Sequence, residues 1–229
     1  MRLNYETSLS GGKTVLCPYH FEHIEKYHEW MKSPFLLEMT GSEPLSYEEE
    51  VKMQQTWRDD EEKCTFILLS KKLCEKYLIH TTDDKIENEV CNEPPLGADF
   101  IKNTLDAMIG DVNLFLSKED NEESESVTDG DQNDMENHCD RRIEMKQAEL
   151  DLMVAEENFR GKGIGKEAAC MMMIYGAEKL GVRKFTVKIK EDNTASRHLF
   201  ENVRNTVFGM IHGNQSSPLY LLMFSLFSH

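Results

Sequence analysis

Apolar side chains recur at two spacings in the first third of the chain, and each spacing predicts a different kind of element. The short apolar run Lys13–Tyr19 predicts a strand, and the helical spacing of apolar residues over His20–Met31 predicts a helix. Ser46 followed by Glu49 has the form of a capping box and begins a second predicted helix. The unbroken apolar run Cys64–Ser70 is typical of a buried strand.

The remaining periodic segments continue this alternation toward the C-terminus. Strands are predicted at Asp106–Leu116, Ala148–Ala155 and Arg183–Lys190, and helices at Ile164–Leu180 and Asn193–Glu201. The order of elements is therefore β-α-α-β-β-β-α-β-α. This order predicts an α/β (α+β) domain built on a mixed central sheet with flanking helices.

Two segments do not fit this order, and we expect them to be insertions in a single domain spanning residues 1–229. The first, at about 71–105, has only weak periodicity. The second, at 117–147, is acidic, since Lys118–Asp140 holds ten acids and one base. A segment that repels itself and has little apolar surface is typical of a solvated loop.

The net charge and the cysteine pattern narrow the choice of partners and compartment. The formal charge is −16, and the acidic stretch supplies −9 of it as one base against ten acids. A chain without a basic face neutralises few phosphates, so we expect no nucleic-acid partner. No apolar run reaches the ~18 residues of a membrane helix, so we expect no membrane partner. Six Cys without a CxxC pair indicate reduced thiols, so we expect a cytoplasmic protein.

A glycine-rich segment, Arg160–Gly165, lies between a predicted strand and a predicted long helix. Glycines let the backbone approach a ligand closely, and the first amides of a helix are free donors at its positive end. The segment therefore predicts a pyrophosphate cradle. A Walker A motif is excluded because Lys166 is not followed by Ser or Thr. Two other interpretations stay open: a plain glycine-rich turn, and the dinucleotide pattern GxGxxA, which Gly163, Gly165 and Ala168 satisfy.

In this context the chain resembles the GCN5-related N-acetyltransferase (GNAT) superfamily, and more closely the N-acetyltransferase 9-like proteins. The similarity rests on Leu150–Gly165 as the acetyl-CoA signature and on Asn193–Glu201 as the second motif. It ends near Val203, so we expect an atypical C-terminal end from about 203. Further matching segments are His28–Ser33, Ser42–Leu45, Lys63–Ile67 and Ile109–Leu116.

The resemblance implies a GNAT-like mixed sheet whose strands splay apart at the acetyl-CoA site, with acetyl-CoA as co-substrate. It implies that one set of backbone groups pairs with the pantetheine arm like an added strand. A second set of amides would hold the pyrophosphate, and two side chains would line the thioester end. The groups that pair with pantetheine belong to Met153, Val154 and Ala155. The amides that hold the pyrophosphate belong to Arg160, Gly161, Lys162, Gly163, Ile164 and Gly165. The side chains at the thioester end are Asn193 and Ser196.

Two acidic residues are candidates for proton transfer. Glu149 and Asp151 are two positions apart on a predicted strand and therefore point to one face. By resemblance to histone-type members of the superfamily, Glu149 is the general base, and Asp151 is the second candidate. Many members have a Tyr acid at the position of Phe200, which has no proton to donate.

The resemblance implies an enzyme that transfers acetyl from acetyl-CoA to an amine of a protein or peptide. An α-amine is favoured over lysine because its pKa is lower by about 2.5 units, which makes its deprotonation easier. Phe200 and the atypical C-terminal end leave a second hypothesis open. In that hypothesis the chain is an acetyl-CoA-binding scaffold with little or no activity.

The sequence predicts no metal site. His20, His23 and His28 are three and five residues apart, which does not bring all three to one turn, so we expect surface positions on a helix. A calcium-like pattern in the acidic stretch lacks the Gly and the final Glu of such loops. Its residues are Asp129, Asp131, Asn133 and Asp140.

Overall fold

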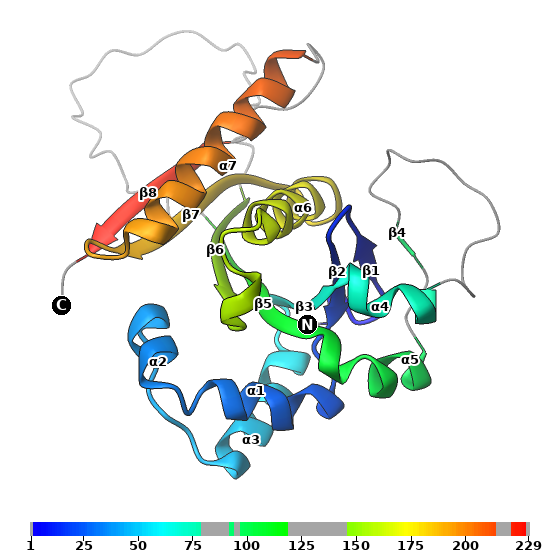
Figure 1. Cartoon of the computed structure of the whole chain (residues 1–229). Coiled ribbons are helices and arrows are strands. Elements are labelled where there is room, and N and C mark those ends of the chain that lie inside the picture. Colours follow the sequence, from blue (N-terminus) through cyan, green and yellow to red (C-terminus); the bar gives the residue numbers. More distant parts are fainter. Residues whose placement is uncertain (1, 79–91, 94–96, 119–145, 214–220, 228–229) are drawn as a thin grey trace, which may run out of the picture.

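The computed structural model describes residues 2–78, 92–93, 97–118, 146–213 and 221–227. These residues form one mixed sheet with helices on both faces (Figure 1). The strands are β1 (Ser8–Ser10), β2 (Thr14–Pro18), β3 (Lys63–Ser70), β4 (Asn92–Glu93), β5 (Met108–Lys118), β6 (Lys146–Val154), β7 (Val182–Lys190) and β8 (Leu221–Phe227). The helices are α1 (Ile24–Trp30), α2 (Pro34–Thr40), α3 (Tyr47–Asp59), α4 (Lys71–Leu78), α5 (Ala98–Asn103), α6 (Ile164–Lys179) and α7 (Thr194–Gly213), with short 3-10 turns η1 (Phe21–His23), η2 (Leu105–Ala107) and η3 (Glu157–Phe159).

The order of strands in the sheet is β4-β1-β2-β3-β5-β6-β7-β8. Every neighbouring pair from β4 to β6 is antiparallel, whereas β6 with β7 and β7 with β8 are parallel. The predicted α/β architecture, a mixed central sheet with flanking helices, is therefore confirmed. The pairing changes from antiparallel to parallel at β6, so this strand lies between the antiparallel part and the parallel part of the sheet.

The strands β6 and β7 separate part-way along their length. Their paired positions end at Glu149 with Thr186, although β6 continues to Val154 and β7 to Lys190. On its other side, β6 stays paired with β5 as far as Val154. The backbone from Leu150 onward thus has a sheet partner on one side only, which is the splayed arrangement that the resemblance implied.

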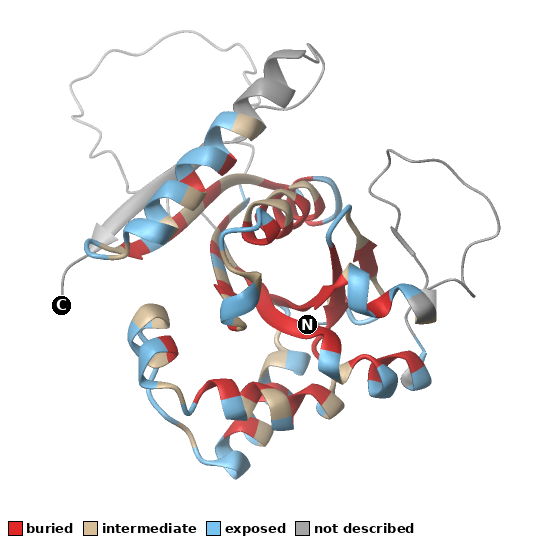
Figure 2. Cartoon of the chain, in the orientation of Figure 1, coloured by how far each residue is buried: buried red, intermediate tan, exposed pale blue. Residues whose placement is uncertain are grey.

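Helices α6 and α7 cover one face of the sheet (Figure 1). The run Met171–Met173 in α6 is buried against this face, as expected for core packing. Gly176 lets the helix lie close to the sheet, because a Cβ there would come within 2.8 Å of Leu114 Cδ1. Figure 2 shows the buried residues concentrated on the strands and on the inner sides of the helices.

The opposite face of the sheet is covered by α1, α3, α4 and α5, which enclose a second core. Cys74 of α4 and Phe100 of α5 belong to this core. The segment at about 71–105 therefore contains two packed helices that its weak periodicity did not predict, because each is only two turns or so long. Residues 79–91 and 94–96 of it lie outside the described residues.

Helix α2 is an element that the sequence pattern did not predict. Pro34 does end the preceding helical segment, but it also occupies the first turn of α2. The Ser33 side chain accepts a hydrogen bond from the Leu36 N–H there. Proline is favoured at such a position because its missing N–H leaves no donor unpaired. The first predicted helix is correspondingly shorter, since α1 begins at Ile24 after a 3-10 turn.

The acidic segment expected at 117–147 is shorter at both ends. β5 and β6 continue as a paired hairpin to Lys118 and Lys146, which face each other in register. The prediction of a loop was therefore wrong for these end residues, where the hairpin pairing outweighs the polar composition. Residues 119–145, with the calcium-like pattern, lie outside the described residues.

The C-terminal end also differs from its prediction. The helix expected at Asn193–Glu201 is too short, because α7 continues to Gly213. The apolar residues Leu221–Phe227 then add β8 beside β7 in parallel. Among the described residues, no helix is long and apolar enough to cross a bilayer.

Candidate functional site

The loop between β6 and α6 is built on glycines in the left-handed conformation. Gly161 and Gly163 have φ values of 71° and 79°, which residues with a Cβ rarely adopt. Gly163 precedes the first turn of α6 without a side-chain cap, so the first amides of this helix are available to a ligand. Residues 155–163 separate strand from helix, so the strand does not run straight into the first glycine and the dinucleotide interpretation is wrong.

The Arg160 side chain ties this loop to the end of β6 and does not extend over the loop. Its Nε and Nη2 donate to the carbonyl oxygens of Val154 and Ala155 at 2.8 and 2.7 Å. Its guanidinium lies 4.9 Å from the centre of the Phe35 ring of α2. The Ala155 N–H donates to the Ile109 carbonyl oxygen. Several backbone groups predicted to pair with pantetheine are thus used by the protein itself.

A cleft of about 670 Å³ lies where this loop, the splayed part of β6 and the start of α7 meet. It brings together most of the residues predicted to bind acetyl-CoA: Met153, Val154, Arg160, Gly161, Gly163, Gly165, Asn193 and Ser196 line it. It is not lined by Ala155, Lys162 or Ile164. Helix α2 contributes four lining residues that no motif had singled out: Phe35, Leu36, Met39 and Thr40.

The start of α7 is organised by its own cap. Asn193 Oδ1 accepts a hydrogen bond from the Ser196 N–H at 3.0 Å. His198 lines the cleft from the same helix and lies 3.8 Å from the Glu201 carboxylate. Phe200, in contrast, is buried in the core beside α6. The position that carries a Tyr acid in many GNAT proteins therefore serves packing in this chain.

The turn between β1 and β2 braces the glycine loop. The Glu167 carboxylate in the first turn of α6 accepts from the N–H groups of Gly12, Lys13 and Thr14, each at 2.9 Å. It also accepts from Thr14 Oγ1 at 2.8 Å. Lys13 Nζ donates to the Lys162 carbonyl oxygen at 2.8 Å. The hairpin thus holds both the loop and the start of α6.

The two predicted proton acceptors lie on one face of β6, as expected, but in different surroundings. Glu149 Oε2 is 2.7 Å from Lys188 Nζ of β7 and is engaged in that ion pair. Asp151 accepts from the Leu152 N–H and remains accessible to solvent. The protein around Asp151 nevertheless displaces enough water to raise the pKa of its carboxyl, and the charge of Glu149 adds to this effect.

A buried carboxyl that no motif indicated lies next to this face. Asp111 and Asn113 of β5 are opposite Met153 and Asp151 in register. Asp111 is 2% exposed, and burial raises the pKa of its carboxyl to about 7, with the charge of Asp151 contributing. Its Oδ2 accepts from Asn113 Nδ2 at 2.8 Å and from Tyr27 Oη at 3.5 Å. Only the folded chain brings Tyr27 to this strand, so no spacing in the sequence could reveal the contact.

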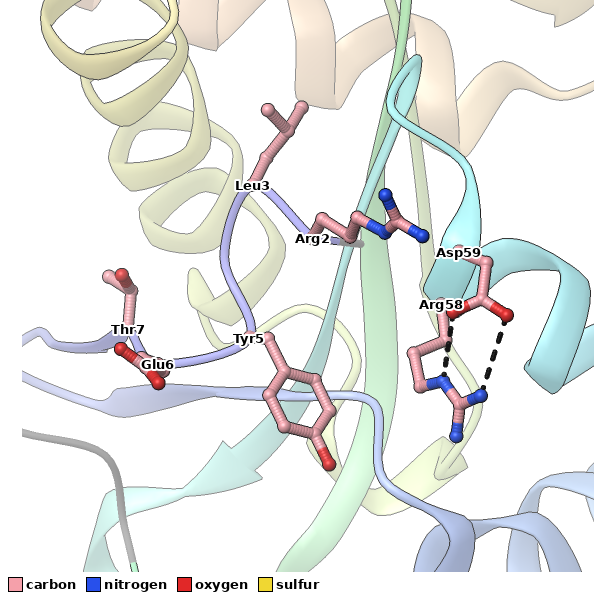
Figure 3. A pocket seen from close by; sticks show the side chains of 7 residues that line it. All are labelled: Arg2, Leu3, Tyr5, Glu6, Thr7, Arg58 and Asp59. Atoms are coloured by element: carbon pink, nitrogen blue, oxygen red, sulfur yellow. Dashed lines mark hydrogen bonds and ion pairs between the residues drawn. The ribbon is translucent and has the colours of Figure 1, made fainter.

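A second hollow lies beside the N-terminal segment and the end of α3 (Figure 3). Figure 3 shows Arg58 and Asp59 in a two-point contact, with distances of 3.2 and 3.4 Å. Arg2 lies 3.5 Å from the Glu61 carboxylate. This hollow shares no residue with the cleft, and its charged residues Arg2, Arg58 and Asp59 are paired locally.

The histidines of the N-terminal region do not form a ligand set. His23 is fully buried, so the expectation that it lies on the surface was wrong. Its Nδ1 accepts from the His20 N–H, and burial lowers the pKa of its imidazole to about 3. The neutral His23 ring packs against Tyr19, which belongs to the core enclosed by α1, α3, α4 and α5. Within the described residues, no group of three or more His, Cys, Asp or Glu is arranged to hold a metal ion.

Comparison with known proteins identifies the family. Residues 13–204 match the acetyltransferase (GNAT) domain model. This chain belongs to the GNAT family. It is therefore an acetyltransferase enzyme that uses acetyl-CoA, as the resemblance implied. The match of this GNAT protein to its family ends at residue 204, close to Val203, from which we expected an atypical end.

Named relatives agree with this assignment. The GNAT chain is 38% identical over 204 residues to alpha/beta-tubulin-N-acetyltransferase 9 of Homo sapiens, covering 89% of this chain and 77% of that protein. It is 38% identical over 203 residues to an N-acetyltransferase 9-like protein of Nematostella vectensis, covering 89% and 79%. The resemblance to the N-acetyltransferase 9-like group is confirmed.

Solved structures show the same fold at low sequence identity. The chain superposes on RimL, a ribosomal L7/L12 alpha-N-protein acetyltransferase in complex with coenzyme A, with a TM-score of 0.53 and 14% identity, covering 86% of this chain and 82% of that chain. It superposes on spermidine N-acetyltransferase from Vibrio cholerae with a TM-score of 0.52 and 14% identity, covering 84% and 80%. Both comparisons confirm the GNAT-like fold.

Proposed function

We propose that this enzyme transfers the acetyl group of acetyl-CoA to the α-amine of a protein or peptide. The observation that carries the proposal is the cleft beside the splayed part of β6, where the glycine loop and the start of α7 converge. The name of the human relative, an alpha/beta-tubulin-N-acetyltransferase, supports a protein acceptor. An α-amine is favoured because its pKa of about 7.7–8.0 leaves a useful neutral fraction at cellular pH, unlike that of lysine.

In this proposal acetyl-CoA lies along the cleft. Its pyrophosphate accepts from the amides of Gly161, Lys162, Gly163, Ile164 and Gly165. The remaining predicted donor, the Arg160 N–H, already donates to the Glu157 carbonyl oxygen at 3.0 Å. Lys162 and Ile164 do not line the cleft, and they contribute backbone donors as neighbours of the lining residues Gly161, Gly163 and Gly165. The pantetheine arm follows the edge of β6 that β7 leaves open, near Met153, Val154 and Ala155, although the carbonyl oxygens of Val154 and Ala155 already accept from Arg160. Asn193 and Ser196 lie toward the thioester end. Arg160 acts by holding the loop to β6.

The acidic face of β6 receives the acceptor amine in this proposal and promotes the loss of its proton. Glu149 and Asp151 remain the two candidates, and their surroundings favour Asp151. Glu149 is held by Lys188, whereas Asp151 has no Lys or Arg partner among the described residues and is open to solvent. The cytoplasm as the compartment belongs to the same proposal, and the free thiols of Cys17, Cys64, Cys74 and Cys170 support it.

The acceptor is tested directly with defined peptides. Synthetic peptides of the first ten residues of α- and β-tubulin are incubated with enzyme and acetyl-CoA. Each is used with a free α-amine, and again with the α-amine formylated while any lysine stays free. We expect CoA release and a single added acetyl group only with the free α-amine. Acetylation confined to lysine would contradict the α-amine, and no acetylation of peptides or of the tubulin dimer would contradict a tubulin acceptor.

The donor site is tested at a glycine with a matched control. Gly163→Val forces a β-branched residue to a φ of 79° and adds a Cβ about 3.0 Å from Lys13 Nζ. We expect CoA affinity, measured by calorimetry, to fall at least tenfold. Gly181→Val imposes similar strain at a φ of 74°, with no atom within 4 Å of the new Cβ, just beyond the opposite end of α6. Equal CoA affinity in the two variants would contradict the proposed pyrophosphate site.

A further inference from the structure

A buried polar cluster adjoins the cleft on the face of the sheet that α1 and α3 cover. We define the polar cluster as Tyr27 of α1, Glu50 of α3, Asp111 and Asn113 of β5, and Asp151 of β6. The register places Asp111 opposite Met153, a lining residue of the cleft, and Asn113 opposite Asp151. Facing residues in an antiparallel pair have Cα atoms about 4.5–5.5 Å apart. The cluster therefore begins where the cleft ends.

The cluster contains buried acceptors that lack donors. Asp111 Oδ1 and Asn113 Oδ1 have no hydrogen-bond partner among the described residues, and their side chains are 2% and 3% exposed. Glu50 Oε2, on a residue 1% exposed, is unpaired as well. Buried polar atoms are normally paired, so these oxygens indicate a position for a group that brings its own donors. A protonated amine brings three N–H donors and no acceptor.

Solvent reaches the cluster at Asp151, whose carboxylate accepts from the Leu152 N–H. Within the described residues, neither Asp111 nor Asp151 has a Lys or Arg partner, whereas Glu149 is occupied by Lys188. The cluster thus combines negative charge, unpaired acceptors and an opening beside the cleft. These are the properties needed to bind a cationic amine and to take a proton from it.

We propose that the acceptor amine enters the polar cluster and loses its proton to Asp111, with Asp151 binding the ammonium at the opening and Tyr27 and Asn113 positioning Asp111. This inference rests on the proposed acetylation of an amine. The ammonium gives one proton to the Asp111 carboxylate, and the neutral nitrogen attacks the thioester carbonyl carbon. The C–N bond forms, the C–S bond breaks, and the second nitrogen proton goes to the departing thiolate. The products are the amide and CoA thiol, and Asp111 returns its proton to water.

Asp111→Asn tests this assignment because it keeps the shape of the side chain and removes its basicity. Using the tubulin peptide that the wild-type enzyme acetylates, we expect kcat to fall 10²- to 10⁴-fold with CoA affinity unchanged. Asp106→Asn, on the exposed turn before β5, is the matched control and should behave as wild type. Tyr27→Phe should lower kcat less, since Tyr27 acts through Asp111.

The pH profile separates proton transfer from a structural effect. The titratable groups that interact with Asp111 are Tyr27, Tyr19 and Asp151. Glu50 interacts with both tyrosines and lies 3.9 Å from His28 Nδ1. Both tyrosines stay neutral, because burial raises the pKa of each well above its ordinary value of 10. We therefore expect the wild-type profile to rise near pH 7 with Asp111. In Asp111→Asn the rise should move to the pKa of the peptide amine, so that the loss shrinks at high pH.

A binding measurement needs no turnover. With CoA bound, the wild-type protein should bind the free α-amine peptide more tightly than its formylated form, and Asp151→Asn should remove that difference. Wild-type kcat in Asp111→Asn across pH 6–9 would overturn the assignment. A pH-independent loss of kcat in Asp111→Asn, accompanied by weaker CoA binding, would also overturn the assignment. If the wild-type enzyme itself acetylates no amine, the proposed function fails first, and that outcome is distinct from these.

Discussion

Asp111 is a carboxyl that the fold keeps partly protonated at neutral pH. Burial raises its pKa from an ordinary value of 3.8 to about 7 in the folded chain. Between these two values the folded chain binds more protons than the unfolded chain. The free energy of unfolding therefore falls as the pH rises through this window. The stability associated with Asp111 is fully present below about pH 4 and is lost above about pH 7.

This shift predicts a stability change in Asp111→Asn. The substitution removes the cost of a buried charge, so the variant should be more stable than the wild type at pH 8, by an amount on the order of a few kcal/mol. The advantage should vanish near pH 4. Urea unfolding followed at several pH values measures it. A variant less stable than the wild type at pH 8 would contradict the assigned pKa shift.

At the scale of elements, the carboxylate of Glu167 joins α6 to the β1–β2 hairpin. Its two oxygens accept from three backbone N–H groups and one hydroxyl. Glu167→Gln turns an NH₂ toward some of these donors, so at least one hydrogen bond is lost. We expect a loss of about 1–3 kcal/mol in unfolding free energy and several-fold weaker CoA binding, because the hairpin braces the loop through Lys13 and Lys162.

Calorimetry and thermal unfolding measure both effects of Glu167→Gln. Glu178→Gln, on an exposed position of the same helix, is the matched control and should leave both values unchanged. If Glu167→Gln unfolds and binds CoA like the wild type, the hairpin does not brace the loop.

The elements that the sequence predicted well are those whose patterns are local. The capping box at Ser46 and Glu49 forms as expected at the start of α3, and the glycine loop forms between β6 and α6. Period-two spacing correctly put Glu149 and Asp151 on one face. Short helices such as α2 and α4 were missed because two turns give too few apolar positions to establish a period.

The polar cluster could not be predicted because it depends on tertiary contacts. Tyr27 and Asp111 are 84 residues apart, and Asn113 meets Asp151 only through the register of β5 and β6. Within the sequence Ile109–Leu116, Asp111 is one polar residue of a strand that resembles the family. Its significance comes from burial, which depends on how α1 and α3 cover the sheet.

At the scale of the whole molecule, the β5–β6 hairpin closes at Lys118 and Lys146 before the acidic segment begins. Replacing residues 119–145 by Asn-Gly should join the paired strands through a two-residue turn that suits their twist. We expect the thermal unfolding midpoint to stay within a few degrees and CoA binding to be unchanged. Replacing the same residues by an equally long Gly-Ser segment separates the effect of charge from that of length. A collapse of stability in both variants would show that the segment packs against the domain.

Because β6 and β7 separate part-way, acetyl-CoA bound as we propose would become a structural component of the sheet. Since the pairing of β6 with β7 ends at Glu149 and Thr186, the C-terminal elements β7, α7 and β8 are joined to β6 by only a few paired positions. A pantetheine arm lying against β6 would occupy the open backbone groups and slow amide hydrogen exchange at Leu150–Val154. By mass action, CoA at about 100 times its Kd would add about 2.7 kcal/mol to the unfolding free energy. The persistence of the folded enzyme in a cell would then follow the supply of CoA and its thioesters.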